Sequence, residues 1–164
     1  MLGDRIGFGR LESKTITWTQ SYDMLNYVCD NALFIRPMHA FGKTPKKGLS
    51  WEDSDLYKWL NSDFKELICS NQKEIDNIRS VTLLSEGDLT MMYKTADSRI
   101  LKPISDANSG QNAIWWLRHT SPITENAAKY VFEDGSICSD APVSSDGIYV
   151  RPVISLFNSQ NYKI

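Results

Sequence analysis

The stretch that most constrains how this chain can fold runs from residue 113 to 156. It contains two apolar segments, AIWWLR at 113–118 and IYVRPVISL at 148–156, with an aspartyl-glycine pair between them at 134–135. The first segment shows no alternation of apolar and polar side chains, which is typical of a strand buried on both faces. The aspartyl-glycine pair favours a tight hairpin turn. The sequence therefore predicts that the chain closes a compact sheet here, with Pro152 near a sheet edge or at a bulge.

Residues nearer the N-terminus predict further strands. Residues 5–18 alternate around a charged tip, which indicates an antiparallel hairpin. Residues 24–36 mix aromatic and aliphatic side chains about Asp30-Asn31, a pair that tolerates the left-handed turn conformation. We expect two more strands there, with a short helix over 24–28 as the alternative.

Helical signals begin at Ser50, which can cap a first turn together with Asp53. Leu56, Trp59 and Leu60 then recur at helical spacing, which predicts a helix over 52–60. The following elements are expected after it: a short helix ending at 68, a turn over 74–78, a strand over 80–84 and a helix over 85–92. Long polar loops are expected at 95–112 and 139–147, and a loosely held tail at 158–164.

The length and composition favour one soluble domain over residues 1–164, because a chain of this size can bury about two thirds of its unfolded surface. Its apolar runs fall well short of the ~20 residues that cross a bilayer. A net charge of −2 gives no general attraction to nucleic acid or to an anionic membrane. The basic cluster of Lys43, Lys46 and Lys47 is interpreted as a solvated loop. The opening MLGDRIGFGR is charged where a secretory signal would be apolar, so we expect a cytoplasmic or virion-associated protein.

The three cysteines, Cys29, Cys69 and Cys138, are odd in number and widely spaced. This pattern argues against a disulfide framework and against a zinc knuckle, so reduced thiols and no metal or other cofactor are expected. A nucleophile built from Cys138 with His119 or His39 would need an orienting third group that the spacing does not indicate. The sequence also lacks a G-x-S-x-G elbow and a glycine-rich phosphate loop. We therefore expect no enzymatic activity.

Several blocks in order resemble one uncharacterised family, the domain of unknown function numbered 6273, which is frequent in Gram-positive bacteria and their phages. These blocks are FG near the start, ITW in the second strand, WEDSDLYKWLNSDF, WWLR, AAKYVFEDGSI and GIYVRPVISL. That family is similar to the C-type-lectin-like fold of formylglycine-generating enzymes and of the variable proteins of diversity-generating retroelements. The resemblance implies an α+β fold with antiparallel sheets and two or three short helices. It also implies that the C-terminal strands and loops display a ligand surface, and it implies no assigned reaction.

Trp115, Trp116, Arg118 and Arg151 are the signature of this expected fold. The tryptophans could form a binding floor for a sugar or a partner side chain, but we favour the interpretation that they are core and that both arginines tie strands together. Ligand contact is expected instead from the polar loops that the strands hold. The candidates are His119, Thr120, Glu125, Asn126, Asp140, Ser144, Ser145, Asp146 and Tyr149.

The resulting hypothesis is a non-enzymatic module that binds a protein or a glycan, associated with a phage or mobile element as its relatives by resemblance are. Two alternatives stay open. One is an oxidoreductase related to the formylglycine-generating enzymes, although those use a close cysteine pair near the C-terminal end and only Cys138 lies in that half. The other is an intracellular inhibitor or structural subunit that binds one protein through the region 43–62.

Overall fold

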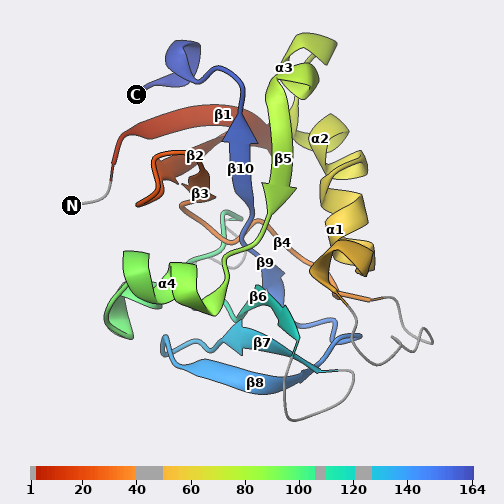
Figure 1. Cartoon of the computed structure of the whole chain (residues 1–164), viewed down its shortest axis with the longest axis vertical. Coiled ribbons are helices and arrows are strands. Elements are labelled where there is room, and N and C mark those ends of the chain that lie inside the picture. Colours follow the sequence, from red (N-terminus) through yellow and green to blue (C-terminus); the bar gives the residue numbers. More distant parts are fainter. Residues whose placement is uncertain (1–2, 40–49, 106–109, 121–126) are drawn as a thin grey trace.

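The computed structural model describes residues 3–39, 50–105, 110–120 and 127–164, with only the backbone described for residues 119 and 120. Within these ranges it contains two five-stranded sheets and four short α-helices, so the expected α+β class is confirmed with more helices than predicted (Figure 1). The first sheet has the order β1 (Arg5–Leu11), β2 (Lys14–Gln20), β3 (Tyr27–Cys29), β10 (Val153–Leu156), β5 (Ile78–Thr82). The second has the order β4 (Phe34–Ile35), β9 (Tyr149–Val150), β6 (Trp115–Thr120), β7 (Ala127–Val131), β8 (Ile137–Pro142).

The first sheet is antiparallel and begins with the hairpin that the alternation at 5–18 predicts. Ile6 pairs with Trp18 across this hairpin, and both side chains are fully buried. The indole N–H of Trp18 donates to the Phe8 carbonyl at 2.9 Å, so the largest side chain of the hairpin is buried with its polar atom satisfied. Residues 27–29 form β3, and the alternative of a helix over 24–28 is therefore wrong.

Helices α1 (Asp55–Leu60), α2 (Asp63–Ile68) and α3 (Gln72–Asn77) lie beside the first sheet, where α1 and α3 contact β5 and α2 contacts β1 (Figure 1). The predicted helix over 52–60 is confirmed from residue 55 to 60 and is wrong over its first turn. A 3-10 turn (Trp51–Asp53) ends at Ser54, whose extended backbone interrupts the helix, and the Ser54 hydroxyl then accepts the Tyr57 N–H at 3.1 Å. Ser50 makes no cap to a backbone N–H and instead donates to the Asp53 carboxylate at 2.8 Å.

Helix α4 (Glu86–Met92) begins where the sequence predicts. The Ser85 hydroxyl accepts the Asp88 N–H at 3.0 Å, and the Asp88 carboxylate accepts the Ser85 N–H at 3.2 Å, which completes a capping box. A 3-10 turn (Asp97–Arg99) follows the helix inside the stretch that was expected to be an irregular loop. The Asp88 carboxylate in the first turn of α4 also accepts the Tyr22 hydroxyl at 3.0 Å, which places the helix beside the β2–β3 loop.

The strand β6 contributes to two groups of core residues. Trp116 belongs to the core around the first hairpin and α1, whereas Trp115 and Leu117 belong to a second core with Leu89 and Val153. Successive side chains of a strand point to opposite faces, so a strand that lies between two apolar layers needs apolar residues at every position. This explains the unbroken apolar run, whose three members are each fully buried.

The C-terminal segment differs from the prediction. Residues 149–150 form β9 in the second sheet, and residues 153–156 form β10 in the interior of the first sheet, between β3 and β5. The expectation that Pro152 places its strand near an edge is therefore wrong. Pro152 lies in the crossing between the sheets, where its missing N–H breaks no ladder bond and its carbonyl accepts the Cys29 N–H at 3.0 Å.

The tail after residue 157 is not loosely held, in contrast to the expectation. Tyr162 lies in a final 3-10 turn (Gln160–Tyr162) and packs edge-on against Phe8, with ring centres 4.8 Å apart. The Tyr27 hydroxyl donates to the Ser159 hydroxyl at 2.9 Å. The end of the chain therefore returns to the first hairpin and covers part of β1.

Candidate functional site

The loops predicted to bind ligand emerge from the same end of the second sheet. Thr120 pairs with Ala128, and Ala127 pairs with Pro142, so β6 ends, β7 begins and β8 ends at one place. We call this place, with the following residues 143–148, the loop end. The lower part of Figure 1 shows β6, β7 and β8 side by side. Their pairing register brings the end of β6, the start of β7 and the end of β8, which leads into 143–148, to a common edge.

The predicted residues in the second of these segments are distributed between strand and turn. Asp140 lies on β8 and is exposed. The strand runs to Pro142, so the loop predicted over 139–147 starts later than expected. Ser144 and Ser145 are half-buried in the turn that follows, and Asp146 is exposed. The Ser145 N–H donates to the Pro142 carbonyl at 2.9 Å, which fixes the turn to the end of β8.

Tyr149 lies apart from these residues. It is half-buried on β9, where it pairs with Ile35 on one side and with Trp115 on the other. Its place inside the sheet separates it from the loop end. The His119 and Thr120 backbones lie in β6, whereas their side chains, like Glu125 and Asn126, fall outside the described part of the chain, as do the lysines of 43–47.

The tryptophans of β6 offer no face to a ligand. Trp115 and Trp116 are both fully buried, and their indole N–H groups donate to the Arg99 carbonyl at 3.2 Å and to the Arg36 carbonyl at 2.9 Å. A binding floor would need an exposed aromatic face, which neither ring has. Their burial agrees with the core interpretation made from the sequence.

Both predicted arginines make structural contacts. Arg151 is 5% exposed and donates from Nε to the Cys29 carbonyl at 2.8 Å and from Nη2 to the Tyr93 hydroxyl at 3.0 Å. Its guanidinium also lies 4.9 Å from the centre of the Trp115 ring. Arg118 is half-exposed and places Nη2 3.6 Å from Asp88 Oδ2. Arg151 thus joins the two sheets, and Arg118 joins β6 to α4.

Near the loop end, the described residue Tyr130 forms a hydrogen-bonded pair with Asp140. The Tyr130 hydroxyl donates to Asp140 Oδ1 at 3.0 Å. Burial, this hydrogen bond and the neighbouring Cys138 together raise the pKa of Tyr130. A tyrosine with a raised pKa remains a neutral hydrogen-bond donor at physiological pH and is unsuited to act as a base. The pair therefore fixes Asp140 in place as an acceptor.

Burial governs the chemistry of two of the cysteines and of the described histidine. All three cysteines are free, and burial raises the pKa of Cys29 to about 12 and that of Cys69 to about 11, which disfavours the nucleophilic thiolate. His39 is 6% exposed, places Nδ1 3.5 Å from an Asp55 carboxylate oxygen and donates its backbone N–H to Val143. Across the described ranges, no group of three or more His, Cys, Asp or Glu residues is placed to hold a metal ion.

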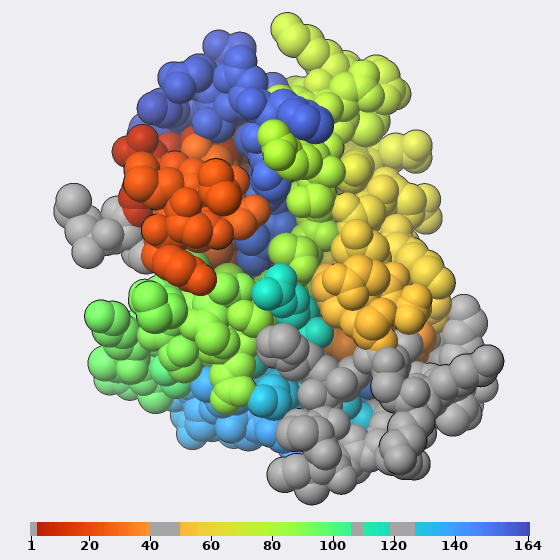
Figure 2. All heavy atoms as spheres, viewed as in Figure 1, coloured from red at the N-terminus to blue at the C-terminus, as the bar shows by residue number. Residues whose placement is uncertain are grey.

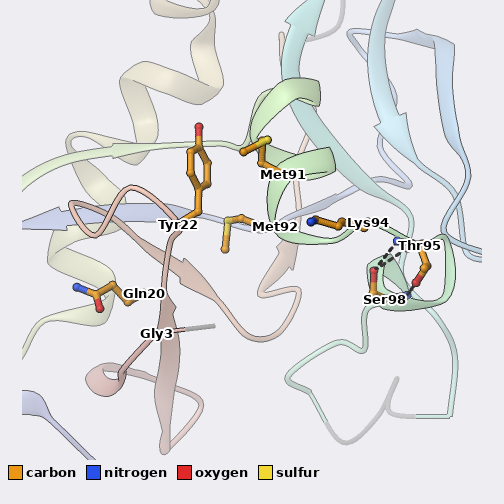
Figure 3. Close-up of a pocket in the computed structure, with 8 residues that line it drawn as sticks. All are labelled: Gly3, Gln20, Tyr22, Met91, Met92, Lys94, Thr95 and Ser98. Carbon is orange, nitrogen blue, oxygen red and sulfur yellow. Dashed lines mark hydrogen bonds between the residues drawn. The ribbon is translucent and has the colours of Figure 1, made fainter. Parts of the chain in front are cut away.

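A groove that the sequence did not indicate lies between the β2–β3 loop and α4. Its volume is about 520 Å³, within the range of small ligand sites. Figure 2 shows the β2–β3 loop, in orange, meeting the green atoms of α4 where the two halves of the molecule join. The lining residues are Gly3, Gln20, Tyr22, Met91, Met92, Lys94, Thr95 and Ser98 (Figure 3).

Three distant segments of sequence meet in this groove, which is why no local motif announces it. Gly3 precedes β1, Tyr22 follows β2, and the methionines at the end of α4 belong to one stretch with Ser98 in the 3-10 turn beyond it. The Tyr22 hydroxyl donates to Asp88 Oδ1 at 3.0 Å, and this bond raises the pKa of Tyr22. Burial alone would raise the pKa of Asp88, but the Ser85 hydrogen bonds, Tyr22 and Arg118 lower it overall, so Asp88 is an anion at neutral pH.

Comparison with known proteins gives no relative for this chain: no family model, no curated protein and no solved structure matches it. None of the helices in the described part of the chain has the length and apolar character that crossing a membrane requires.

Proposed function

We propose that the chain is a binding module without catalytic activity that contacts a protein or a glycan through the loop end. The observation that supports this proposal is the register of β6, β7 and β8, in which the strand ends that flank the first predicted loop lie beside the strand end that leads into the second. A rigid sheet that holds clustered polar loops is a common arrangement for recognition. The resemblance to lectin-like domains of phages and mobile elements supports the same proposal.

The described side chains at the loop end suit recognition of a polar partner. Asp140 and Asp146 are exposed carboxylates, and Ser144 and Ser145 add hydroxyl groups that both donate and accept. Asp140 is held by Tyr130, so less conformational freedom is lost when a ligand engages it. These groups provide several hydrogen bonds to a sugar or to a peptide backbone.

We do not propose an oxidation of the formylglycine-generating kind. That chemistry needs two cysteines close together near the C-terminal end, and Cys138 is alone in that half. Sugars and polar protein surfaces present similar hydrogen-bond donors and acceptors, so both fit this geometry. The two ligand classes are therefore separated by experiment.

The test compares the wild-type chain with a variant in which Asp140, Ser144, Ser145 and Asp146 are all changed to alanine. A glycan array and capture from a host lysate, read by mass spectrometry, would identify the ligand, whose affinity is then measured by calorimetry. We expect the variant to remain folded by circular dichroism and to lose binding by at least about tenfold.

The matched control carries Asp76→Ala and Ser70→Ala, two exposed positions on the α3 side of the molecule. It should bind like the wild type. The proposal is wrong if the identified ligand binds the loop-end variant with unchanged affinity, or if neither assay finds a ligand for the wild-type chain.

A further inference from the structure

Large apolar side chains stand in solvent around the groove between the β2–β3 loop and α4. Tyr22 is 51% exposed, Met91 58%, Met24 70% and Leu25 71%. Tyr22 and Met91 line the groove, and the Met24 carbonyl accepts a hydrogen bond from the lining residue Gln20 at 3.2 Å. We call the surface formed by Tyr22, Met24, Leu25, Met91 and Lys94 the groove face. Apolar side chains gathered beside a groove, unlike single ones, mark an interaction surface.

The loop that carries three of these side chains is held in one conformation. The Asp23 carboxylate accepts the Leu25 N–H at 2.9 Å and the Asn26 side-chain amide at 3.0 Å, and it also bonds to the Ser21 hydroxyl. Ser21 N–H donates to the Asn26 carbonyl at 2.7 Å, which closes the loop. The loop is therefore fixed by hydrogen bonds rather than by burial of its apolar residues.

Met24 shows that this presentation has an energetic cost. Its φ is +60°, a left-handed conformation that is unfavourable for a non-glycine residue and that persists only where surrounding contacts impose it. This conformation leaves the side chains of Met24 and Leu25 exposed, and exposed apolar side chains do not stabilise the isolated fold. Strained backbone that displays apolar side chains is typical of a surface prepared for a partner.

The charge around the groove selects the partner. The lining residues include Lys94 and no carboxylate. Two acids close to Tyr22 are already engaged: Asp23 by its own loop, and Asp88 by Ser85, Tyr22 and Arg118. In Figure 3 the Lys94 side chain extends toward the methionines, so its ammonium group borders the apolar floor. A ligand that fills the groove therefore needs an apolar group with a carboxylate beside it.

We propose that the groove face binds a short segment of a partner protein that presents an apolar side chain next to a carboxylate. The apolar side chain packs against Met91 and Met92, whose flexible thioethers adapt to different shapes, and the carboxylate pairs with Lys94. A protein segment fits better than a small molecule because the exposed Met24 and Leu25 are not among the residues that line the groove, and a segment that extends past the groove can contact them as well. This surface is separate from the loop end, so either proposal can fail alone.

The probe for this proposal is a displayed library of random linear peptides selected on the full chain. Enriched peptides are expected to share an aliphatic or aromatic residue within a few positions of Asp or Glu. Synthetic copies should bind the variants Leu25→Ser, Met91→Ser and Lys94→Glu about tenfold more weakly than the wild type. Neutralising the peptide carboxylate as an amide should weaken binding to the wild type and not to Lys94→Glu.

The matched controls are Leu67→Ser, which removes a 53% exposed apolar side chain from α2, and Lys73→Glu, which reverses an exposed charge on α3. Both should bind the peptides like the wild type. All five positions are exposed, so circular dichroism should show unchanged folds. Three results would overturn the proposal: no enrichment of apolar–acidic peptides, equal binding by the groove-face variants and the controls, or concentration-dependent self-association of the wild type that the same variants abolish, which would make a second copy of the chain the occupant.

Discussion

Replacement of Arg151 by methionine tests whether this residue stabilises the contact between the two sheets or binds a ligand. The guanidinium is 5% exposed and donates to the Cys29 carbonyl on β3 and to the Tyr93 hydroxyl after α4. Its carbon also lies 4.8 Å and 4.9 Å from the ring centres of Tyr93 and Trp115. The residue occupies the crossing between β9 and β10, where a lost contact affects both sheets.

The expected loss of stability follows from these contacts. Hydrogen bonds to a charged group contribute about 1.5–3 kcal/mol each, and a desolvated cation–π contact about 1–2 kcal/mol. Burial of the guanidinium opposes these gains by several kcal/mol, and methionine removes that penalty. We therefore expect Arg151→Met to lower the free energy of unfolding by about 3 kcal/mol. For a chain of this length, that loss corresponds to a decrease in Tm of about 6–12 °C.

The assay is urea unfolding followed by tryptophan fluorescence, with Tyr93→Phe as a graded control. That change removes one acceptor hydroxyl and keeps the ring, so it should cost about 1 kcal/mol. The opposite result is also informative. If Arg151→Met unfolds within about 0.5 kcal/mol of the wild type and loses ligand binding instead, Arg151 is a ligand clamp and the reasoning from burial is wrong.

Three further changes test the backbone, a helix cap and a buried thiol, each by urea unfolding. Gly135→Ala should lower the free energy of unfolding by more than about 2 kcal/mol, because φ is +87° and the added Cβ would lie 1.9 Å from the Ala96 carbonyl oxygen. Gly147→Ala meets nothing within 4 Å and should be neutral, so equal stability of the two variants would contradict the argument. Ser85→Ala removes the capping box of α4 and should cost about 1 kcal/mol, whereas no loss would show that the cap is dispensable. Burial raises the pKa of Cys29 from 9.0 to about 12, so the unfolded chain ionises first; stability should fall as the pH rises from 9 to 12, by up to about 1.4 kcal/mol per pH unit more in the wild type than in Cys29→Ala. Parallel pH profiles would contradict this assignment.

Elements with a strong local signal could be predicted from the sequence. The alternation around the first hairpin, the aspartyl-glycine turn and the capping box at Ser85 each depend on neighbours in the chain, and each element forms where it was expected. The unbroken apolar run of β6 also predicted its burial on both faces. In these cases, local propensity and tertiary packing favour the same structure.

Elements whose form depends on distant partners were predicted less well. The segment 149–156 looks like one strand, but Arg151 and Pro152 carry it from one sheet to the other because Cys29 and Tyr93 supply the matching acceptors. Ser50 and Ser54 both resemble helix caps and both have an extended backbone, but only the Ser54 hydroxyl accepts a hydrogen bond from a backbone N–H of the following turn. The spacing of apolar residues along the sequence does not indicate either outcome.

The candidate sites show the same division. The loop end was within reach of sequence reasoning because hairpin order determines which strand ends lie together, although Asp140 proved to lie on a strand and Tyr149 inside the sheet. The groove was not, since Gly3, Tyr22 and Met91 come from separate segments that each look ordinary. The only local sign was the pair Met24-Leu25, two apolar residues in a short polar turn.

Asp88 links these two surfaces physically. Its carboxylate accepts the Tyr22 hydroxyl at the groove, accepts the Ser85 N–H at the start of α4, and faces Arg118 on β6. Arg118 precedes by two residues the point where β6 reaches the loop end at Thr120. Because the Ser85 and Arg118 contacts remain when Tyr22 leaves, a segment bound in the groove can displace the phenol without leaving Asp88 unpartnered. The lost hydrogen bond then affects mainly the exposed Tyr22. Binding in the groove therefore need not disturb α4 or the sheet that supports the loop end.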